Sequence, residues 1–196
     1  MSLTFATPAS LEDLALILGQ DAAAWLIAGG TDRLIAPARL PESGRIVDLG
    51  HLPDFRRIAA ADGALRLGAG VTVATLAGDP AIARLAPVLA QAAEQFGSVQ
   101  IRNRATIGGN VAHGSAAADL VPALMAAGAM VRLWRPVGEE VLPMADLLGR
   151  KPRLAPDEVI LRFDLPTTGA QPPRGAFVKL GPRQEPVISR LTLAAA

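Results

Sequence analysis

The N-terminal part of the chain changes from a helical to an extended hydrophobic pattern. Apolar residues recur at helical spacing after Ser10, and Asp13 stands at the capping-box position, which together predict a helix over residues 11–18. Residues 25–28 then form a continuous apolar run that stops at a glycine pair, the pattern of a strand buried on both faces. Residues 45–49 predict a second strand. These elements predict a small α/β unit.

The next stretch predicts a hairpin and helices. Apolar-alternating arms within residues 57–70 flank Asp62-Gly63, a dipeptide that favours the tight turn of a β-hairpin. A helical segment is expected to follow this hairpin. One-sided apolar spacing then predicts a longer helix over residues 80–96, with its register reset at Pro87.

The next stretch, residues 97–118, is rich in Gly, Asn, Ser and Thr. This composition predicts little periodic structure. The elements predicted after it are a helix over residues 119–127, a hairpin over residues 130–142, and strands over residues 159–165 and 176–181. The final apolar segment, residues 187–193, has the pattern of a strand, and we expect it to lack a sheet partner.

Composition favours a globular protein and excludes several functions. Apolar residues make up 51% and charged residues 19%, enough hydrophobic material to offset the entropy lost on ordering. The formal charge of +1 and the lack of a long Lys/Arg block do not indicate nucleic-acid binding. Without cysteine, this sequence cannot ligate an iron–sulfur cluster through thiolates. No secretory signal and no run of about 20 apolar residues is seen, so we expect a cytoplasmic protein without a membrane span.

The first candidate site is the motif Ala28-Gly29-Gly30-Thr31-Asp32, where the predicted strand ends. Glycines at such a turn let backbone N–H groups point at a phosphate without interference from a Cβ atom, and Thr31 adds a hydroxyl donor. A glycine pair after a strand is also often no more than a turn. The motif lacks the glycine spacing of the dinucleotide fingerprint, so a Rossmann site is not indicated.

The second candidate site is the motif Thr106-Ile107-Gly108-Gly109-Asn110, followed by Ser115 and Asp119 ahead of a predicted helix. A second glycine pair, with free backbone N–H groups and flanking donors, is what a diphosphate needs if it is gripped from two sides. Asp119 has two interpretations: it accepts hydrogen bonds from sugar hydroxyls, or it caps the helix that follows.

Together and in this order, the two motifs resemble those of the FAD-binding domain of the molybdenum hydroxylase family, which includes xanthine dehydrogenase and aerobic carbon monoxide dehydrogenase. Further matching stretches are Ile46-Val47-Asp48-Leu49 with Pro53, Leu67-Gly68-Ala69-Gly70-Val71-Thr72, and residues 102–111 followed by Ser115 and residues 119–124. Because these stretches span nearly the whole chain in the family's order, the combination is highly specific.

The resemblance implies which residues contact the cofactor. Residues 28–32 and 106–110 would grip the diphosphate of FAD, and Asp119 would hold one of its hydroxyl groups.

Three weaker matches, Phe96, Ile160 and Lys179, would touch the flavin. Their alternative interpretation is purely structural: Phe96 and Ile160 pack in the core, and Lys179 is the solvent-facing residue of a strand.

The resemblance also implies an α+β fold, the two-lobed FAD-binding domain of the PCMH (vanillyl-alcohol oxidase-like) type. A small N-terminal α/β lobe, residues 1–55, and a larger mixed-sheet lobe, residues 56–175, would hold FAD between them. In the family a further domain normally follows, so we interpret residues 176–196 as the start of a truncated or absent C-terminal domain.

The implied function is that of an FAD-dependent oxidoreductase subunit, the FAD-binding component of a molybdopterin dehydrogenase. A molybdenum-binding large subunit would oxidise the substrate, a [2Fe-2S] small subunit would relay electrons, and FAD on this chain would deliver them to an acceptor such as NAD, quinone or oxygen. No catalytic or metal-binding residue is assigned, and His51 and His113 are interpreted as loop residues. Three alternatives stay open: a stand-alone flavin oxidoreductase, a non-catalytic flavin- or nucleotide-binding or assembly module, and a ligand other than FAD.

Overall fold

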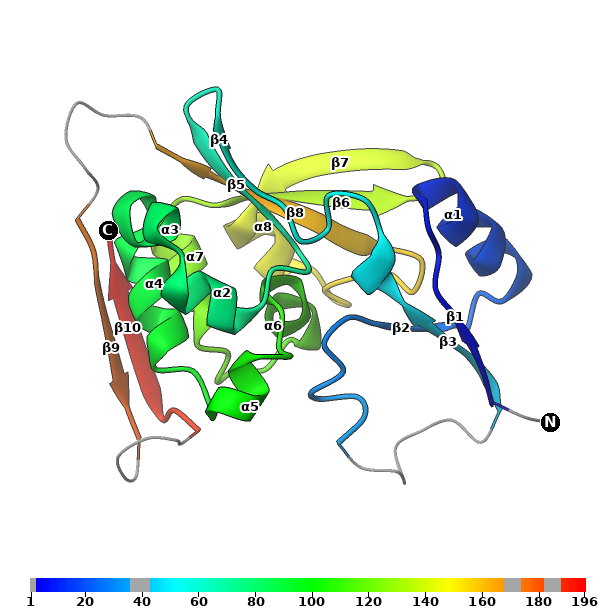
Figure 1. The fold of residues 1–196 in the computed structure, drawn as a ribbon, viewed down its shortest axis with the longest axis horizontal. Coiled ribbons are helices and arrows are strands. Elements are labelled where there is room, and N and C mark those ends of the chain that lie inside the picture. Colours follow the sequence, from blue (N-terminus) through cyan, green and yellow to red (C-terminus); the bar gives the residue numbers. More distant parts are fainter. Residues whose placement is uncertain (1–2, 36–42, 168–173, 182–187) are drawn as a thin grey trace.

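The computed structural model describes residues 3–35, 43–167, 174–181 and 188–196 (Figure 1). Its strands are β1 (Leu3–Ala6), β2 (Trp25–Ile27), β3 (Gly44–Asp48), β4 (Ile58–Ala61), β5 (Ala64–Gly68), β6 (Met130–Arg135), β7 (Gly138–Pro143), β8 (Val159–Pro166), β9 (Ala176–Leu180) and β10 (Leu191–Ala195). Its helices are α1 (Leu11–Gln20), α2 (Val73–Gly78), α3 (Pro80–Leu85), α4 (Pro87–Glu94), α5 (Val99–Arg102), α6 (Ile107–His113), α7 (Leu120–Ala126) and α8 (Met144–Gly149), with a short 3₁₀ turn, η2 (Leu49–His51).

The N-terminal part is a three-stranded parallel sheet in the order β1-β3-β2, with α1 as the crossover between β1 and β2. The Ser10 hydroxyl caps α1 by accepting a hydrogen bond from the Asp13 N–H, and the helix buries Leu14 and Leu18. The predicted helix and both predicted strands are confirmed, and β1 is an additional strand. The expectation that β2 is buried on both faces is wrong, because β2 is an edge strand and its residues are only half-buried.

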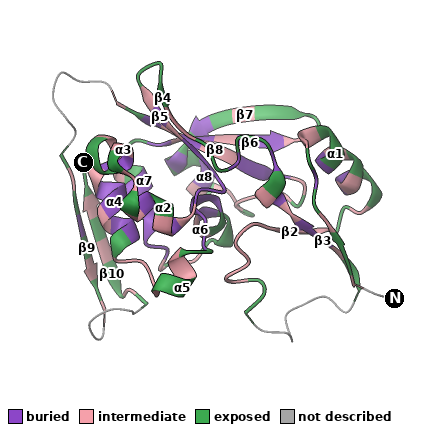
Figure 2. Ribbon diagram, in the orientation of Figure 1, coloured by how far each residue is buried: buried purple, intermediate pink, exposed green. Residues whose placement is uncertain are grey.

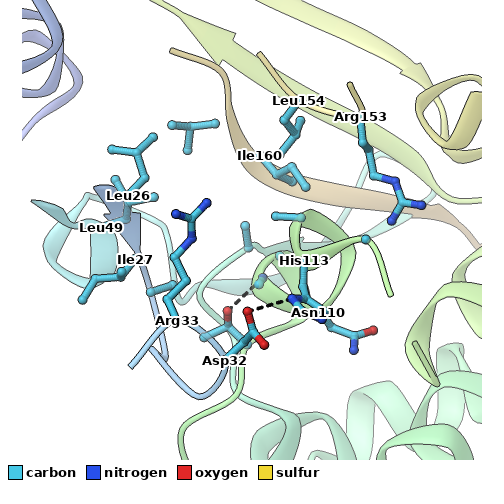
Figure 3. Close-up of a pocket in the computed structure, with 18 of the residues that line it drawn as sticks. Leu26, Ile27, Asp32, Arg33, Leu49, Asn110, His113, Arg153, Leu154 and Ile160 are labelled. Atoms are coloured by element: carbon cyan, nitrogen blue, oxygen red, sulfur yellow. Dashed lines mark hydrogen bonds and ion pairs between the residues drawn. The ribbon is translucent and has the colours of Figure 1, made fainter. Parts of the chain in front are cut away.

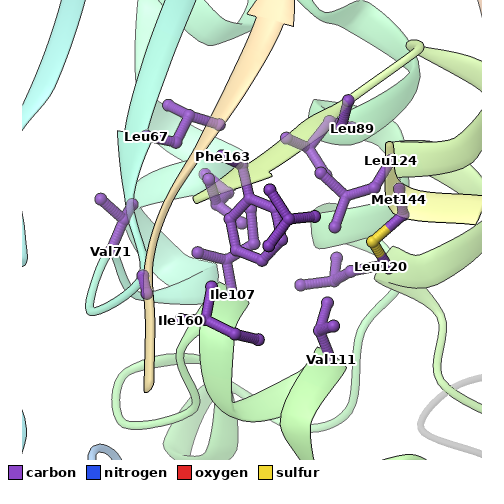
Figure 4. Close-up of a cluster of buried hydrophobic side chains, with 14 of the residues drawn as sticks. Leu67, Val71, Leu89, Ile107, Val111, Leu120, Leu124, Met144, Ile160 and Phe163 are labelled. Carbon is purple, nitrogen blue, oxygen red and sulfur yellow. The ribbon is translucent and has the colours of Figure 1, made fainter. Parts of the chain in front are cut away.

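The largest sheet has five antiparallel strands in the order β4-β5-β8-β6-β7. Both predicted hairpins are confirmed. The turn of the first places Asp62 and Gly63 at φ 51° and 71°, the conformation that a two-residue hairpin requires. One face of this sheet packs against the helices, and Phe163 lies fully buried at the centre of that core, close to Ile107 and Leu124 (Figure 4).

Helices fill the space between the five-stranded sheet and a two-stranded antiparallel sheet of β9 and β10, which contacts α4 and α7 (Figure 1). The side-chain amide of Gln91 in α4 is both a donor and an acceptor toward this sheet. Its Nε2 donates to the Gly175 carbonyl, and its Oε1 accepts from the Phe177 N–H. The expectation that the final strand lacks a partner is therefore wrong, because β10 pairs with β9 along its whole length. Residue 187 of that predicted segment lies outside the described residues.

The expectation of little periodic structure over residues 97–118 is also wrong. Two short helices, α5 and α6, occupy much of it, and each begins at a hydroxyl side chain that accepts a backbone hydrogen bond, Ser98 for α5 and Thr106 for α6. The predicted interruption at Pro87 is confirmed as the boundary between α3 and α4. The chain thus has a mixed α/β fold in which buried residues concentrate where the helices meet the large sheet (Figure 2).

Within the described residues, no helix combines the length and the apolar character needed to cross a bilayer.

Replacing Phe163 by Ala tests this account of the core. The substitution removes a ring that the five-stranded sheet and the helices share, so we expect it to lower the free energy of unfolding by about 3–5 kcal/mol. Denaturant unfolding followed by circular dichroism measures this loss. Val137→Ala is the matched control: Val137 is 90% exposed, so its loss should change stability by no more than about 0.5 kcal/mol.

Candidate functional site

A cleft of about 1240 Å³ lies where the three-stranded sheet meets the helices and the large sheet (Figure 3). Three segments contribute most of its lining: β2 with the loop that follows it, the N-terminal turns of α6, and residues from 148 to 160, here called the wall segment. The cleft exceeds the roughly 300–1,000 Å³ that drug-sized ligands occupy, so it has room for a dinucleotide.

The first predicted motif forms one side of this cleft. Residues 28–33, here called the first loop, all line it. The backbone N–H groups of Gly29 through Arg33 find no acceptor within the described part of the chain. Gly30 has φ 72°, the left-handed conformation that favours glycine. Consecutive N–H donors without an internal partner are the usual means by which a loop binds an anion.

Gly29 brings the first loop against the second motif. A Cβ atom at this position would overlap the carbonyl oxygen of Arg104 and crowd Ala105, so only glycine allows the two backbones to approach this closely. Arg104 and Ala105 directly precede Thr106, which begins α6. The two motifs are therefore adjacent in space, as predicted.

The second motif meets the cleft differently from the first, because its backbone N–H groups are already used. The N–H of Ile107 donates to the Val71 carbonyl, and that of Gly108 donates to the Ala69 carbonyl. Those of Gly109 and Asn110 donate to Thr106. The expectation of free backbone donors from this glycine pair is therefore wrong: the motif is the first turn of a helix held against the end of β5.

Side chains of the second motif supply the free polar groups instead. Thr106 is buried, and its hydroxyl accepts from the Gly109 N–H, which leaves the hydroxyl proton available for a further acceptor. The Asn110 Oδ1 atom is buried without a hydrogen-bond partner among the described residues. A buried polar atom without a partner in a cleft lining is a point where a ligand or an ordered water would complete the hydrogen bonding.

An ion-pair contact joins the first loop to α6. The Asp32 Oδ2 atom lies 2.8 Å from the Nδ1 atom of His113, the last residue of α6 (Figure 3). Beside it, the Arg33 guanidinium stacks 5.0 Å from the ring centre of Trp25. The prediction that His113 is a loop residue is therefore wrong, because His113 is the last residue of α6 and contacts Asp32.

Charged side chains fix the wall segment. The buried Glu158 carboxylate accepts hydrogen bonds from Arg150 and from the Ala155 N–H, and it also pairs with Arg135. A hydrogen bond from Arg150 lowers the pKa of the exposed Glu140 carboxyl, and the same bond raises the pKa of Arg150. The guanidinium of Arg150 thus stays charged at the cleft.

The wall segment is also tied directly to α6. Arg153 donates from Nη1 to the Val111 carbonyl at 2.9 Å. This bond fixes the spacing between two sides of the cleft.

The structure places most of the predicted site residues in the cleft lining. Those present are Ala28, Gly29, Gly30, Thr31, Asp32, Phe96, Thr106, Gly108, Gly109, Asn110 and Ile160. Phe96 is half-buried, and Ile160 lies at the boundary, because it lines the cleft and also belongs to the core. Ile107 is not part of the lining, because its side chain is fully buried in the core.

Asp119 and Lys179 also lie outside the lining and form a buried ion pair with each other. The Lys179 Nζ atom is 2.7 Å from Asp119 Oδ2 and donates to the Gln95 carbonyl at 3.0 Å. Asp119 makes no side-chain capping bond to α7, so the capping interpretation is wrong, and the solvent-facing interpretation of Lys179 is wrong because its side chain is 3% exposed. Gln95 directly precedes Phe96, which lines the cleft.

Sequence reasoning missed the charged groups Arg33, His113, Arg150 and Arg153. The run Arg150-Lys151-Pro152-Arg153, between a helix and a strand, was an available signal of a basic segment. No sequence signal predicts the Asp32–His113 contact, because it depends on how the first loop packs on α6.

Comparisons with known proteins identify the family. Residues 1–168 match the model of the FAD binding domain in molybdopterin dehydrogenase. The nicotine 6-hydroxylase medium subunit of Paenarthrobacter nicotinovorans is 34% identical over 85% of this chain and 60% of its own length. A putative xanthine dehydrogenase FAD-binding subunit of Escherichia coli is 34% identical over 95% of this chain and 65% of its own length.

Solved structures are similar over nearly the whole chain. Quinoline 2-oxidoreductase from Pseudomonas putida 86 superposes with a TM-score of 0.86 at 27% identity, covering 99% of this chain and 68% of that one. A Cu,Mo-CO dehydrogenase superposes with a TM-score of 0.87 at 25% identity and the same coverage.

The chain therefore belongs to the family of FAD-binding domains of molybdopterin dehydrogenases, as the resemblance predicted, and FAD is its cofactor. It spans 60% and 65% of the lengths of these two curated relatives.

The close approach at Gly29 is tested by Gly29→Ala. Because the added methyl group would overlap backbone atoms of Arg104, the first loop must separate from the second motif. We expect the thermal midpoint to fall by several degrees, which corresponds to about 1–3 kcal/mol.

The matched control for this substitution is Gly19→Ala. Gly19 is an exposed helical residue whose Cβ position is open. This change should raise stability by about 0.5–1 kcal/mol. Equal effects of the two substitutions would contradict the account of the contact.

Proposed function

We propose that the cleft holds the diphosphate of FAD between the first loop and the second motif. In this arrangement the backbone N–H groups of residues 29–33 bind phosphate oxygens from one side. The Thr106 hydroxyl and the Asn110 side chain bind the cofactor from the other side. One observation carries this proposal: the unpaired N–H donors of the first loop and the polar side chains of Thr106 and Asn110 line the same cleft.

Neighbouring residues supply charge and apolar surface to the same site. The guanidinium groups of Arg150 and Arg153 line the cleft and favour an anionic ligand. Phe96 and Ile160 offer apolar surface for a planar ring system. Asp119 and Lys179 stay predicted cofactor contacts, although they pair with each other and neither lines the cleft.

The two-lobed arrangement is part of the same proposal. The three-stranded sheet belongs to residues 1–55 and the five-stranded sheet to residues 56–175, and the cleft has residues of both in its lining. This division supports the PCMH-type assignment, with FAD between the lobes. The β9-β10 sheet begins the stretch 176–196 that we assign to a separate C-terminal unit.

The chain acts in this proposal as the electron-transfer subunit of a molybdenum hydroxylase. When bound, FAD would supply the chemistry for passing electrons from a [2Fe-2S] partner to an acceptor such as NAD, quinone or oxygen. The chain's own residues bind and orient the cofactor and keep its phosphates neutralised. Relatives named as medium subunits of nicotine 6-hydroxylase and carbon monoxide dehydrogenase support a partnership with a molybdenum-binding large subunit and an iron–sulfur small subunit.

Gly109→Val tests the flavin site. Gly109 is exposed in the cleft lining, and a Cβ atom there would lie 2.8 Å from the Thr106 hydroxyl oxygen, so a larger side chain displaces this hydroxyl and extends into the space proposed for the cofactor. We expect FAD affinity to fall at least tenfold, about 1.4 kcal/mol or more, as measured by fluorescence titration.

The control for this test is Gly78→Val. Gly78 is exposed at the end of α2, away from the cleft, and its Cβ position is open. This variant should bind FAD as the wild type does. Gly30→Val is less informative, because φ 72° strains any side chain at that position whether or not a ligand binds. Undiminished FAD binding by the Gly109 variant would rule out the proposed position of the diphosphate.

Co-purification with the products of neighbouring genes tests the electron-transfer role. We expect one complex whose absorbance shows both flavin and iron–sulfur bands, and substrate should bleach the flavin only when the partners are present. A flavin-loaded chain that oxidises a substrate alone would favour the stand-alone oxidoreductase. A colourless chain whose melting temperature does not rise with added FAD would favour the non-catalytic module.

A further inference from the structure

The first loop contains a negative charge close to the groups that we propose bind phosphate. Asp32 lies among the unpaired N–H groups of residues 29–33, and its side chain is 45% exposed at the cleft. A carboxylate and a diphosphate repel each other, and the repulsion grows as the cleft loses water around them. A loop that binds an anion therefore requires something to offset Asp32.

His113 is positioned to offset it. Its Nδ1 atom lies 2.8 Å from Asp32 Oδ2, and it stands at the C-terminus of α6, where the helix dipole favours a positive charge. The contact is an ion pair when the imidazole is protonated and a neutral hydrogen bond when it is not.

Other charged groups nearby keep their charge but make their direct contacts elsewhere. Arg153, from the wall segment, lies next to Gly114 but donates to the Val111 carbonyl. Arg33, in the first loop, stacks on Trp25. Glu158, the buried carboxylate of the wall segment, is paired with two arginines. Among the described residues, Asp32 is therefore the ion-pair partner of His113.

We propose that His113 is a positioning residue for FAD, which neutralises Asp32 so that the first loop can accept the diphosphate. This inference rests on the proposed function of the cleft and goes beyond it, because it assigns a role to a residue that need not touch the cofactor. It makes FAD affinity depend on the charge state of one imidazole. The affinity should fall as pH rises through the range in which histidine loses its proton, while the diphosphate keeps its charge.

A double-substitution experiment on the full chain separates charge compensation from simple anchoring. His113→Leu removes both the charge and the hydrogen bond, and we expect FAD to bind about tenfold more weakly near pH 6.5 at low salt. Adding Asp32→Asn removes the uncompensated carboxylate, so the double variant should recover most of that loss. If His113 merely anchors the loop, the double variant will bind as weakly as His113→Leu, and the proposal is wrong.

His113→Gln is the second variant, because it keeps a hydrogen-bonding side chain without the charge. It should bind FAD as weakly as His113→Leu, and its affinity should lack the pH dependence expected of the wild type. It also replaces His113→Leu in the double-substitution test if the leucine variant does not fold, which thermal unfolding of the apoprotein shows. Wild-type affinity or an unchanged pH profile in His113→Gln overturns the proposal.

The wild-type measurement distinguishes failure of the proposed flavin site from failure of the proposed role of His113. A wild-type chain that binds no FAD at any pH contradicts the proposed flavin site itself. A wild-type chain that binds FAD with no dependence on pH or on His113 contradicts only the role of the Asp32–His113 pair.

Discussion

The cleft depends on one close contact between two stretches of backbone. Gly29 packs directly on the carbonyl group of Arg104, and a side chain at that position would hold the three-stranded sheet away from α6. On the other side, the start of α6 is fixed to the large sheet, because Ile107 and Gly108 donate to the carbonyl groups of Val71 and Ala69. The first loop therefore rests on a surface that is itself rigid, and the distance between the two motifs is determined by hydrogen bonds and packing within the protein.

Glycine is required in the two pairs for different physical reasons. Gly30 is needed for its left-handed conformation and Gly29 for the contact with Arg104, and together they leave the backbone donors of the first loop unpaired. Gly108 is needed because a Cβ atom would collide with Ala69, which is a requirement of packing rather than of binding. The site is consequently asymmetric: main-chain donors face it from the first loop, and side chains face it from the second motif.

Much of the fold was predictable from the sequence, because strong local signals agree with the tertiary structure. The Ser10 cap, the Asp62-Gly63 turn and the break at Pro87 all appear where the pattern indicates. Errors arose where tertiary contacts outweigh local preference. α6 forms from a sequence with two adjacent glycines because the Thr106 cap and hydrogen bonds to the segment after β5 hold its first turn.

The two motifs were predictable as one site, but the atoms they offer were not. A glycine pair looks the same in sequence whether its N–H groups are free, as in the first loop, or bonded, as at Gly108. Likewise, the pairing of Asp119 with Lys179 joins residues far apart in the chain, and neither residue carries a local signal of burial. Which hydrogen-bonding groups of the site are free therefore follows from the three-dimensional structure and not from the sequence pattern.

Trp25, which stacks against Arg33, is an intrinsic fluorescence probe of the cofactor site. The sequence contains 2 tryptophans, and they occupy contrasting places: Trp25 lines the cleft, whereas Trp134 is buried in the core. Emission from Trp25 should respond to movement of the loop and to energy transfer to a nearby isoalloxazine chromophore, while emission from Trp134 changes chiefly when the core unfolds. One spectrum can thus follow occupancy of the cleft and integrity of the fold as separate signals, without any added label.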